Sequence, residues 1–212
     1  MPMEEVQPDS SHTEKLLEQV QGGDRHAFDQ LFASHRAYLR QIVELRLDPR
    51  LRARVDPSDV VQEAHLEAFR RLSAYLRQRP MPFRLWLRQI AYDRTLKARR
   101  RHLGAARRAV TSELPLPEQS SLVLARQLFS GGSTPSQQLD RRELAQRLRQ
   151  AMAQLPGADR EVILMRHFEG LSNPEAGCLL GIDAATVSER HGRAMLRLHR
   201  ILFSGGLTES QL

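Results

Sequence analysis

The chain has 212 residues, a formal net charge of +7, a pI of about 10.6 and a single cysteine. This size allows one or two domains, and the lone cysteine excludes a disulfide framework, as expected for a protein of the reducing cytoplasm. No apolar run approaches the roughly 20 residues that a membrane span needs, and the polar, acidic start of the chain is unlike a secretory signal peptide. Because β-branched residues are too sparse for several strands, we expect an all-α fold.

Two long helices are expected in the first third of the chain, as parts of a small bundle. Asp24 stands where a helix N-cap belongs. The buried stripe of its helix is expected to be Phe28, Leu31, Leu39 and Ile42. Asp56 and Pro57 predict the start of the second helix, because an acid favours the cap and proline favours the first turn. The buried stripe of this helix is expected to be Val61, Ala64, Ala68 and Leu72.

Most of the positive charge is concentrated in residues 84–108. This segment holds nine Lys or Arg and one acid, Asp93, whereas residues 1–31 hold seven acids and two bases. A solvated helix face is one explanation, and part of the apolar stripe in this segment is expected to be core. However, three aromatic residues alternate with the basic ones: Phe83, Trp86 and Tyr92. Because aromatic rings stack on bases and guanidinium groups follow the phosphate backbone, the pattern favours binding to single-stranded nucleic acid.

Glycine, proline and serine gather in residues 104–136, which is the composition of a flexible linker. A short apolar run, SSLVLARQLF at residues 120–129, interrupts it. The GGSTPS sequence at residues 131–136 lacks the lysine of a phosphate-binding loop. We therefore expect two small helical domains joined by a flexible linker.

Residues 170–193 carry the pattern of a helix-turn-helix. Ser172 predicts a helix N-cap, and Glu175, three residues later, completes a capping box. Gly181 predicts the end of this helix, because a residue without Cβ adopts positive φ readily. Gly177 allows a second helix to approach closely.

Asp183 predicts the N-cap of that second helix, whose apolar stripe is expected to be Val187, Ala194, Leu198 and Leu202. An ordinary amphipathic hairpin is the alternative, but several arginines on the other faces favour DNA binding. In such motifs the N-terminal part of the second helix enters the major groove. The candidate base readers are Thr186, Ser188, Glu189 and Arg190, and the candidate phosphate contacts are Arg193 and Arg197.

No enzyme motif accompanies these patterns. The eight histidines, Cys178 and the carboxylates show no metal-ligand spacing and no nucleophile–base arrangement. We therefore expect no catalytic residue, no metal site and no cofactor.

Four sequence blocks occur in a fixed order: GDRHAFDQLFASHRAYL, DPSDVVQEAHLEAF, FRLWLRQIAYDRTLKARRR and LPGADREVILMRHFEGLSNPEAGCLLGIDAATVSERHGRAMLRL. In this order they resemble an RNA polymerase sigma factor of the extracytoplasmic-function (ECF) group. The resemblance implies a disordered tail at 1–14, a region 2-like domain at 15–103, a linker at 104–136, a region 4-like helix-turn-helix domain at 137–203 and a tail at 204–212.

The resemblance also implies a division of labour. The first domain would bind the clamp of the core polymerase through one helix face, formed by Asp59, Gln62, Glu63, Leu66 and Phe69. It would hold the melted minus-ten strand through the basic segment, by Phe83, Arg84, Trp86, Arg88, Gln89, Tyr92, Lys97, Arg99 and Arg100. The loop region 75–83 lies where family members hold a flipped non-template base. The second domain would bind the minus-thirty-five element and the polymerase flap, and the run at 120–129 would thread the active cleft or pack on either domain.

The chain departs from the family pattern at a few positions. Asp93 replaces a usual asparagine, and Gly177 replaces a common alanine. In the second helix of the motif, Ser188, Glu189 and His191 replace more usual residues, so the duplex sequence that is read is expected to be atypical. Glu189 is able to accept a hydrogen bond from a cytosine amino group.

The partners that the resemblance implies are core RNA polymerase, promoter DNA as duplex and as melted non-template strand, and an anti-sigma factor. The chain would act in the cytoplasm, at the nucleoid when bound to polymerase, and would promote melting because it binds free strand better than duplex. The alternative is a stand-alone helix-turn-helix regulator whose N-terminal bundle senses a signal or dimerises. Binding of stoichiometric core polymerase separates the two functions.

Overall fold

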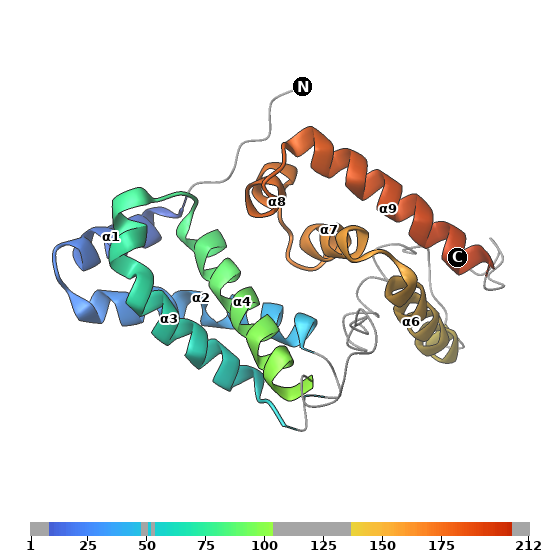
Figure 1. The fold of residues 1–212 in the computed structure, drawn as a ribbon, viewed down its shortest axis with the longest axis horizontal. Coiled ribbons are helices and arrows are strands. Elements are labelled where there is room, and N and C mark those ends of the chain that lie inside the picture. The colour runs from blue at the N-terminus through green and yellow to red at the C-terminus, as the bar shows by residue number, and fades with distance from the viewer. Residues whose placement is uncertain (1–8, 48–50, 52–53, 104–136, 205–212) are drawn as a thin grey trace. The chain divides into compact units, whose positions relative to one another are not determined.

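The computed structural model describes residues 9–47, 51, 54–103 and 137–204, and these residues form α-helices and no strand (Figure 1). The predicted all-α fold is therefore confirmed for this part of the chain. The chain divides into two compact units, one within residues 5–108 and the other within residues 109–212. The expected linker at 104–136, with its apolar run, lies outside the described residues.

The N-terminal unit contains α1 (Ser11–Gln21), α2 (Arg25–Arg46), α3 (Pro57–Gln78) and α4 (Phe83–Leu103). The predicted caps of α2 and α3 are confirmed. An Asp24 carboxylate oxygen accepts from the His26 amide at 2.8 Å, and an Asp56 oxygen accepts from the Ser58 amide at 2.7 Å. Both helices therefore begin where a short-range acid satisfies an otherwise unpaired amide.

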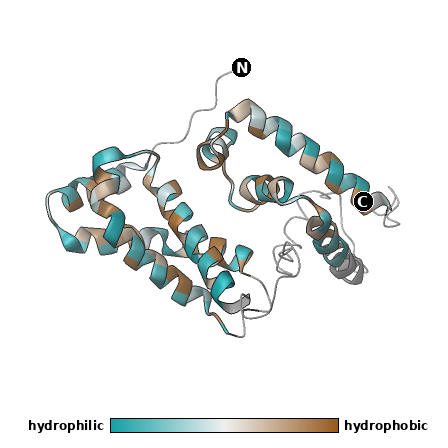
Figure 2. Cartoon of the chain, in the orientation of Figure 1, coloured by the Kyte–Doolittle hydropathy of each residue, from teal (hydrophilic) through white to brown (hydrophobic). Residues whose placement is uncertain are grey.

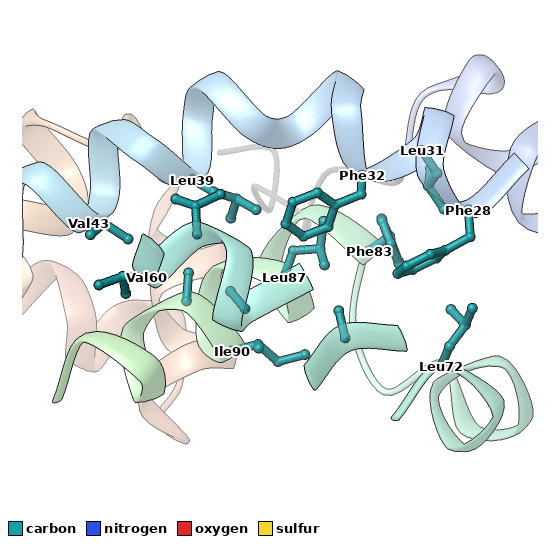
Figure 3. Close-up of a cluster of buried hydrophobic side chains, with 14 of the residues drawn as sticks. Phe28, Leu31, Phe32, Leu39, Val43, Val60, Leu72, Phe83, Leu87 and Ile90 are labelled. Carbon is teal, nitrogen blue, oxygen red and sulfur yellow. The ribbon is translucent and has the colours of Figure 1, made fainter. Parts of the chain in front are cut away.

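The core of this unit lies between α2, α3 and α4 (Figure 3). Hydrophilic and hydrophobic residues alternate along these helices, as expected when one face of each is buried (Figure 2). Both predicted stripes are confirmed: all eight of their side chains are buried, the most exposed being Leu72 at 7%. Helix α4 contributes Phe83, Leu87 and Ile90 to the same cluster.

The N-terminal boundary differs from the expectation of a disordered tail up to residue 14. Helix α1 begins at Ser11, and the Ser10 hydroxyl accepts from the Thr13 amide at 3.2 Å as its N-cap. Leu16 and Leu17 of α1 are buried in the core. The tail prediction therefore needs correction, because a helix capped by Ser10 and holding two buried leucines begins at Ser11.

The C-terminal unit contains α6 (Gln137–Gln154), α7 (Gly157–His167), α8 (Asn173–Leu180) and α9 (Ala184–Ser204). Its core is formed by apolar residues from all four helices, including Leu148, Met152, Ile163, Ala176 and Val187, each at 0% exposure. Helices α7 and α8 both pack on α9. The unit thus encloses α8 and α9, the two helices of the predicted DNA-binding motif.

Candidate nucleic-acid interface

The first helix of the motif starts with the predicted capping box. The Ser172 hydroxyl accepts from the Glu175 amide at 3.3 Å, and the Glu175 carboxylate accepts from the Ser172 amide at 2.8 Å. Glu175 is only 2% exposed. The reciprocal bonds satisfy two amides at the start of α8 and fix where the chain enters the helix.

The turn between α8 and α9 depends on two glycines for different reasons. Gly181 has a φ of 68°, the left-handed conformation in which glycine has no steric penalty. At Gly177, a Cβ would lie 2.5 Å from the backbone oxygen of Ile182. The close approach predicted at Gly177 is therefore confirmed, and it is an approach of the turn's backbone to α8.

The second helix of the motif, α9, begins after the predicted cap, Asp183. Its carboxylate accepts from the Thr186 hydroxyl at 2.6 Å and from the Thr186 amide at 2.8 Å. The bond from the Thr186 side chain is the largest cause that lowers the pKa of Asp183, so this cap stays charged. The predicted stripe is confirmed, since Val187, Ala194, Leu198 and Leu202 are all buried.

The remaining faces of α9 hold the candidate DNA contacts. Ser188, Glu189 and Arg193 are exposed, and Arg190 is half-buried. Thr186 is half-buried and its hydroxyl is engaged with Asp183, so its candidate role as a base reader competes with capping. These residues lie in the first half of α9, the part that such motifs present to the major groove.

Arg197, expected to contact phosphate, is exposed and forms an ion pair with Asp159 of α7. The pair links the two helices within the C-terminal unit. A DNA phosphate bound by Arg197 would therefore either share the guanidinium with Asp159 or replace Asp159 as its partner.

A histidine pair between α7 and α9 was not expected from the sequence. Nε2 of His167 lies 2.9 Å from Nε2 of His191, and the ring centroids are 5.1 Å apart. Burial is the main cause that lowers the pKa of both imidazoles, and the charge of Arg166 adds to it. His191 therefore has a packing role in the motif. The two residues are 24 positions apart, so no local pattern pairs them.

Two residues of α4 that were expected to contact the melted DNA strand are buried, and their assignment needs correction. Phe83 is 0% exposed and packs against Tyr75 and Trp86, with ring centroids 5.5 and 5.4 Å away. Arg88 is 2% exposed, and its guanidinium lies over the Tyr92 ring at 5.1 Å. Neither side chain is positioned to touch a DNA strand. Phe83 belongs to the helix-spaced apolar stripe of α4, part of which was expected to be core, whereas the burial of Arg88 was not expected.

The other aromatic residues of α4 are half-buried. Trp86 stacks on Tyr75 at 4.5 Å between ring centroids. Tyr92 is approached by two buried guanidinium groups, those of Arg88 and of Arg46, the latter at 4.9 Å. The exposed side of α4 is polar: Gln89, Lys97 and Arg100 are exposed, and Arg84 and Arg99 are half-buried. Asp93, the departure from the family pattern, is also exposed.

Two acids of α3 hold basic residues of α4. Glu67 pairs with Arg94 at 3.2 Å, and Glu63 pairs with Arg101 at 3.0 Å. Glu63, expected to bind polymerase, is therefore already engaged within the domain. The ion pairs direct part of the positive charge of α4 toward α3 instead of toward a ligand.

The exposed face of α3 carries an apolar pair. Leu66 is 53% exposed and Phe69 is 48% exposed, and Asp59 and Gln62 are exposed on the same helix. Among the described residues, Leu196 of α9 is the only other large apolar side chain with comparable exposure. Leu66 and Phe69, three residues apart, lie on the same side of α3 and form a small exposed apolar pair.

In the part of the chain that the structure covers, no group of three or more His, Cys, Asp or Glu is arranged to hold a metal ion. Among the same residues, no helix combines the length and apolar composition that crossing a bilayer requires.

Residues 145–198, which contain the capped motif, match the family described as Sigma-70, region 4. The chain is 30% identical over 187 residues to the RNA polymerase sigma factor CnrH of Cupriavidus metallidurans, covering 88% of this chain and 92% of the relative. The chain belongs to the ECF group of RNA polymerase sigma factors.

Further relatives extend this similarity across both domains. The ECF RNA polymerase sigma-E factor of Escherichia coli K12 is 29% identical over 184 residues, covering 84% of this chain and 88% of the relative. The solved structure of CnrH in complex with the cytosolic domain of CnrY matches with a TM-score of 0.57 and 26% identity, over 92% of this chain and 99% of that chain.

As a sigma factor, the chain directs RNA polymerase to promoters. Sigma factors are regulatory proteins whose family function is not enzymatic. The stand-alone regulator is not favoured, because the similarity to sigma factors includes the N-terminal domain and is not confined to the helix-turn-helix.

Proposed function

We propose that α9 reads the minus-thirty-five element through its first half. The observation that supports this is the combination of a fully capped motif with exposed polar side chains immediately after the cap: Ser188 and Glu189, followed by Arg190 and Arg193. Arg190 is the residue best suited to a guanine, because its fork matches the two acceptors of that base in the major groove. Arg193 and Arg197, farther along, are assigned to phosphates.

The N-terminal domain is proposed to bind the melted minus-ten strand along the polar side of α4. The contact set is Arg84, Trp86, Gln89, Tyr92, Lys97, Arg99 and Arg100, with Phe83 and Arg88 as buried support. Stacking contributes about 1 to 3 kcal/mol per base. That is comparable to the few kcal/mol needed to unstack and unpair a base. The chain then promotes melting by binding free strand better than duplex, without a chemical step of its own.

Core polymerase is proposed to bind α3 through Leu66 and Phe69. Their exposure is the observation that carries this assignment, since burying an apolar side chain stabilises a complex by roughly 25 cal/mol per Å² of apolar area removed from water. Asp59 and Gln62 would form the polar edge of the same contact. Glu63 would contribute only after its pair with Arg101 is rearranged or shared.

An anti-sigma factor is proposed as the partner that holds the chain inactive. CnrH, the relative that matches 92% of this chain in structure, was solved in complex with the cytosolic domain of CnrY. An inhibitor of this kind would cover the exposed polymerase-binding face of α3 or the DNA-facing side of α9. The chain would act in the cytoplasm, and at the nucleoid when bound to polymerase.

The proposed domain limits follow from these assignments. We place the polymerase-binding and strand-binding domain at residues 9–103, extending the expected start at residue 15 by the ordered segment before it. The duplex-binding domain stays at residues 137–203, and residues 104–136 connect the two.

Reconstituted initiation tests the proposal. Core polymerase from the same bacterium is combined with the chain, and transcripts are mapped on promoters that respond to its forced expression in cells. We expect initiation only with the chain present, and a strong loss for Leu66→Glu because a charge would enter the apolar contact. Gln41→Glu is the matched control, since it adds the same charge at an exposed position of α2, outside the proposed contacts. Identical transcripts with and without the chain would contradict the assignment.

A further inference from the structure

The short loop between α3 and α4, residues 79–82, has a conformation that its own residues do not stabilise. Arg79 ends α3 with a φ of 37°, and it is the only non-glycine residue with positive φ among those described. This left-handed conformation crowds the Cβ of any residue other than glycine. Something outside the loop must therefore favour arginine here or compensate for its strain.

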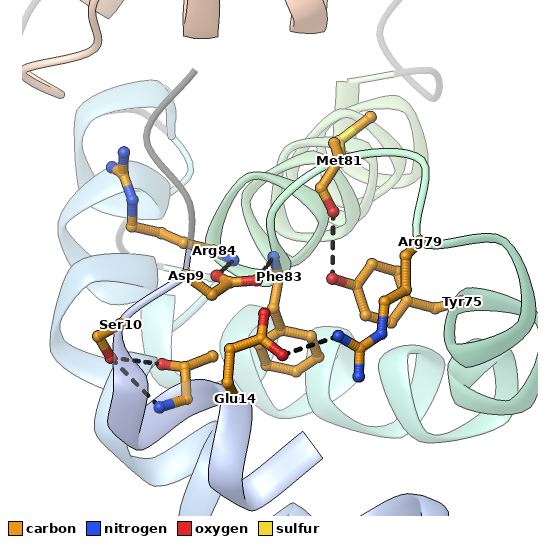
Figure 4. Close-up of polar contacts among 9 residues, drawn as sticks. Asp9, Ser10, Glu14, Tyr75, Arg79, Met81, Phe83 and Arg84 are labelled. Atoms are coloured by element: carbon orange, nitrogen blue, oxygen red, sulfur yellow. Dashed lines mark hydrogen bonds and ion pairs between the residues drawn. The ribbon is translucent and has the colours of Figure 1, made fainter. Parts of the chain in front are cut away.

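The start of α4 also lacks a local cap. Residue 82 is a proline, whose side chain has no hydrogen-bond acceptor, although its carbonyl oxygen accepts from the Leu85 and Trp86 amides. The amides of Phe83 and Arg84 need another acceptor. Asp9 supplies it: its carboxylate accepts from the Phe83 amide at 2.7 Å and lies 3.5 Å from the Arg84 amide (Figure 4).

A second acid from the same N-terminal segment reaches the other end of the loop. The Arg79 guanidinium donates to the Glu14 carboxylate of α1 at 2.7 Å (Figure 4). Glu14 is partly exposed and lies 65 residues before its partner. Asp9 and Glu14 thus contact the end and the beginning of the loop from one short stretch of chain.

The middle of the loop is fixed from α3. The Tyr75 hydroxyl donates to the backbone oxygen of Met81 at 3.1 Å. Burial of Tyr75, with the nearby charge of Asp9, raises the pKa of its hydroxyl well above the ordinary value. The hydroxyl therefore keeps the proton that it donates. Tyr75 also packs on Phe83 and Trp86, so the loop rests on the same aromatic cluster as α4.

We propose that Asp9 and Glu14 are positioning residues that hold loop 79–82 in the conformation that receives the unpaired base during promoter opening. This inference rests on the proposed function, in which this region binds the melted strand. The three contacts leave the loop little freedom, so the entropy of ordering it is lost on folding and not on binding DNA. Neither acid is proposed to touch DNA.

An exchange of charge tests the Glu14 contact. The measurement is the affinity of the reconstituted holoenzyme for a non-template oligonucleotide from a promoter that the wild-type chain opens. The probe carries either the normal base or an abasic sugar at the position to be flipped. We expect Glu14→Arg and Arg79→Glu each to lower the preference for the base by about two- to fivefold, the effect of one partly exposed ion pair. The double variant restores the pair and should regain the preference.

A second variant separates positioning from stability. Arg79→Gly removes the guanidinium but places glycine in the left-handed conformation, where it is favoured. Because an exposed ion pair contributes little to folding, we expect no decrease in melting temperature. The preference for the base should nevertheless fall as in Arg79→Glu, which a merely structural role of the pair would not produce.

Asp9 is tested in the same assay with a conservative replacement. Asp9→Asn keeps an oxygen that accepts from the Phe83 amide and should stay near wild type, whereas Asp9→Ala should lose the preference. The inference is overturned if the single variants match the wild type, or if the charge exchange stays as defective as Arg79→Glu, which would place Arg79 on the DNA itself. If the wild-type chain directs no initiation, the proposed function fails as well, and the two failures are thus distinguished.

Discussion

The two domains support their DNA-facing helices in different ways. In the C-terminal domain, α8 and α9 are capped by residues at most three positions away, through Ser172 with Glu175 and Asp183 with Thr186. In the N-terminal domain, the first amides of α4 are bonded by Asp9, 74 residues earlier in the chain. The recognition motif is therefore specified locally, whereas the strand-binding helix depends on the rest of its domain being folded.

This difference has a consequence for how each helix presents its ligand-binding residues. The first half of α9 holds three consecutive polar or charged candidates, Ser188, Glu189 and Arg190, next to a single buried stripe. Helix α4 is covered by α2 and α3 together, and it therefore buries even an arginine, Arg88. Substitutions in α4 should more often reduce stability along with binding, and substitutions in α9 should separate the two.

The largest expected effect concerns Phe83, which was expected to contact DNA but is buried in the core. Phe83→Ala should lower the free energy of unfolding of the N-terminal domain by about 3 to 5 kcal/mol, because it empties a fully buried aromatic site. Trp86 is the only tryptophan of the chain, so its fluorescence reports unfolding of this domain in urea. Gln89→Ala, on the exposed side of α4, is the control and should change stability by less than about 0.5 kcal/mol. If Phe83→Ala were as stable as the wild type, the assignment of Phe83 to the core would be wrong.

A matched pair of glycines tests how tightly the local motif is built. Gly177→Ala should destabilise the C-terminal domain by about 1 to 3 kcal/mol, because the added Cβ meets a backbone oxygen of the turn. Gly192→Ala makes the same change in α9 with no atom within 4 Å, and should stabilise the domain by up to about 1 kcal/mol. Amide hydrogen exchange in α8 and α9 measures both. Equal effects of the two substitutions would mean that the turn moves freely to admit a Cβ.

Local signals explain what could be predicted from the sequence. The caps at Asp24, Asp56, Ser172 and Asp183 and the buried stripes of α2, α3 and α9 each depend on residues a few positions apart, and all are confirmed. Periodicity identifies one apolar face, but it does not show how many neighbours cover a helix. The burial of Phe83 agrees with its place in a helix-spaced apolar stripe with Leu87 and Ile90. The burial of Arg88 and the contacts of Asp9 and of His167 with His191 depend on tertiary packing and have no local signal.

A substitution of Arg190 tests whether the first half of α9 contacts bases. Arg190→Ala should weaken binding to the correct minus-thirty-five duplex by about 1 to 3 kcal/mol if its guanidinium contacts a guanine. The measurement is a titration of holoenzyme against duplexes that differ at single base pairs. The variant should lose discrimination at one position and keep it at the others. A uniform loss on every duplex would instead assign Arg190 to a phosphate.

The two kinds of cap are compared directly by removing one of each. Ser172→Ala and Asp9→Ala should each destabilise their own domain by about 1 kcal/mol, the usual effect of losing an N-cap. Trp86 fluorescence should respond to Asp9→Ala only, and hydrogen exchange in α8 to Ser172→Ala only. The comparison becomes sharper with a fragment of residues 15–103, which lacks Asp9 and Glu14 together with the first turn of α1 and should be less stable than the domain in the full chain. An equally stable fragment would show that the long-range cap contributes nothing to folding.

The smallest expected effect is a pH dependence confined to the C-terminal domain, where His167 and His191 meet. Burial lowers the pKa of both rings in the folded state, and the charge of Arg166 acts in the same direction. Between these lowered values and the ordinary value of about 6.5, the unfolded chain binds more protons than the folded one, so stability falls as pH decreases through this window. The slope cannot exceed about 1.4 kcal/mol per pH unit for each proton, and partial exposure of the rings keeps it well below that ceiling. Hydrogen exchange in α7 and α9 between pH 7.5 and 5.5, corrected for the intrinsic exchange rate, should show the loss, and His191→Gln should flatten it because one of the two buried bases is gone. An unchanged slope in that variant would assign the pH dependence to other groups and leave the histidine pair as a packing contact alone.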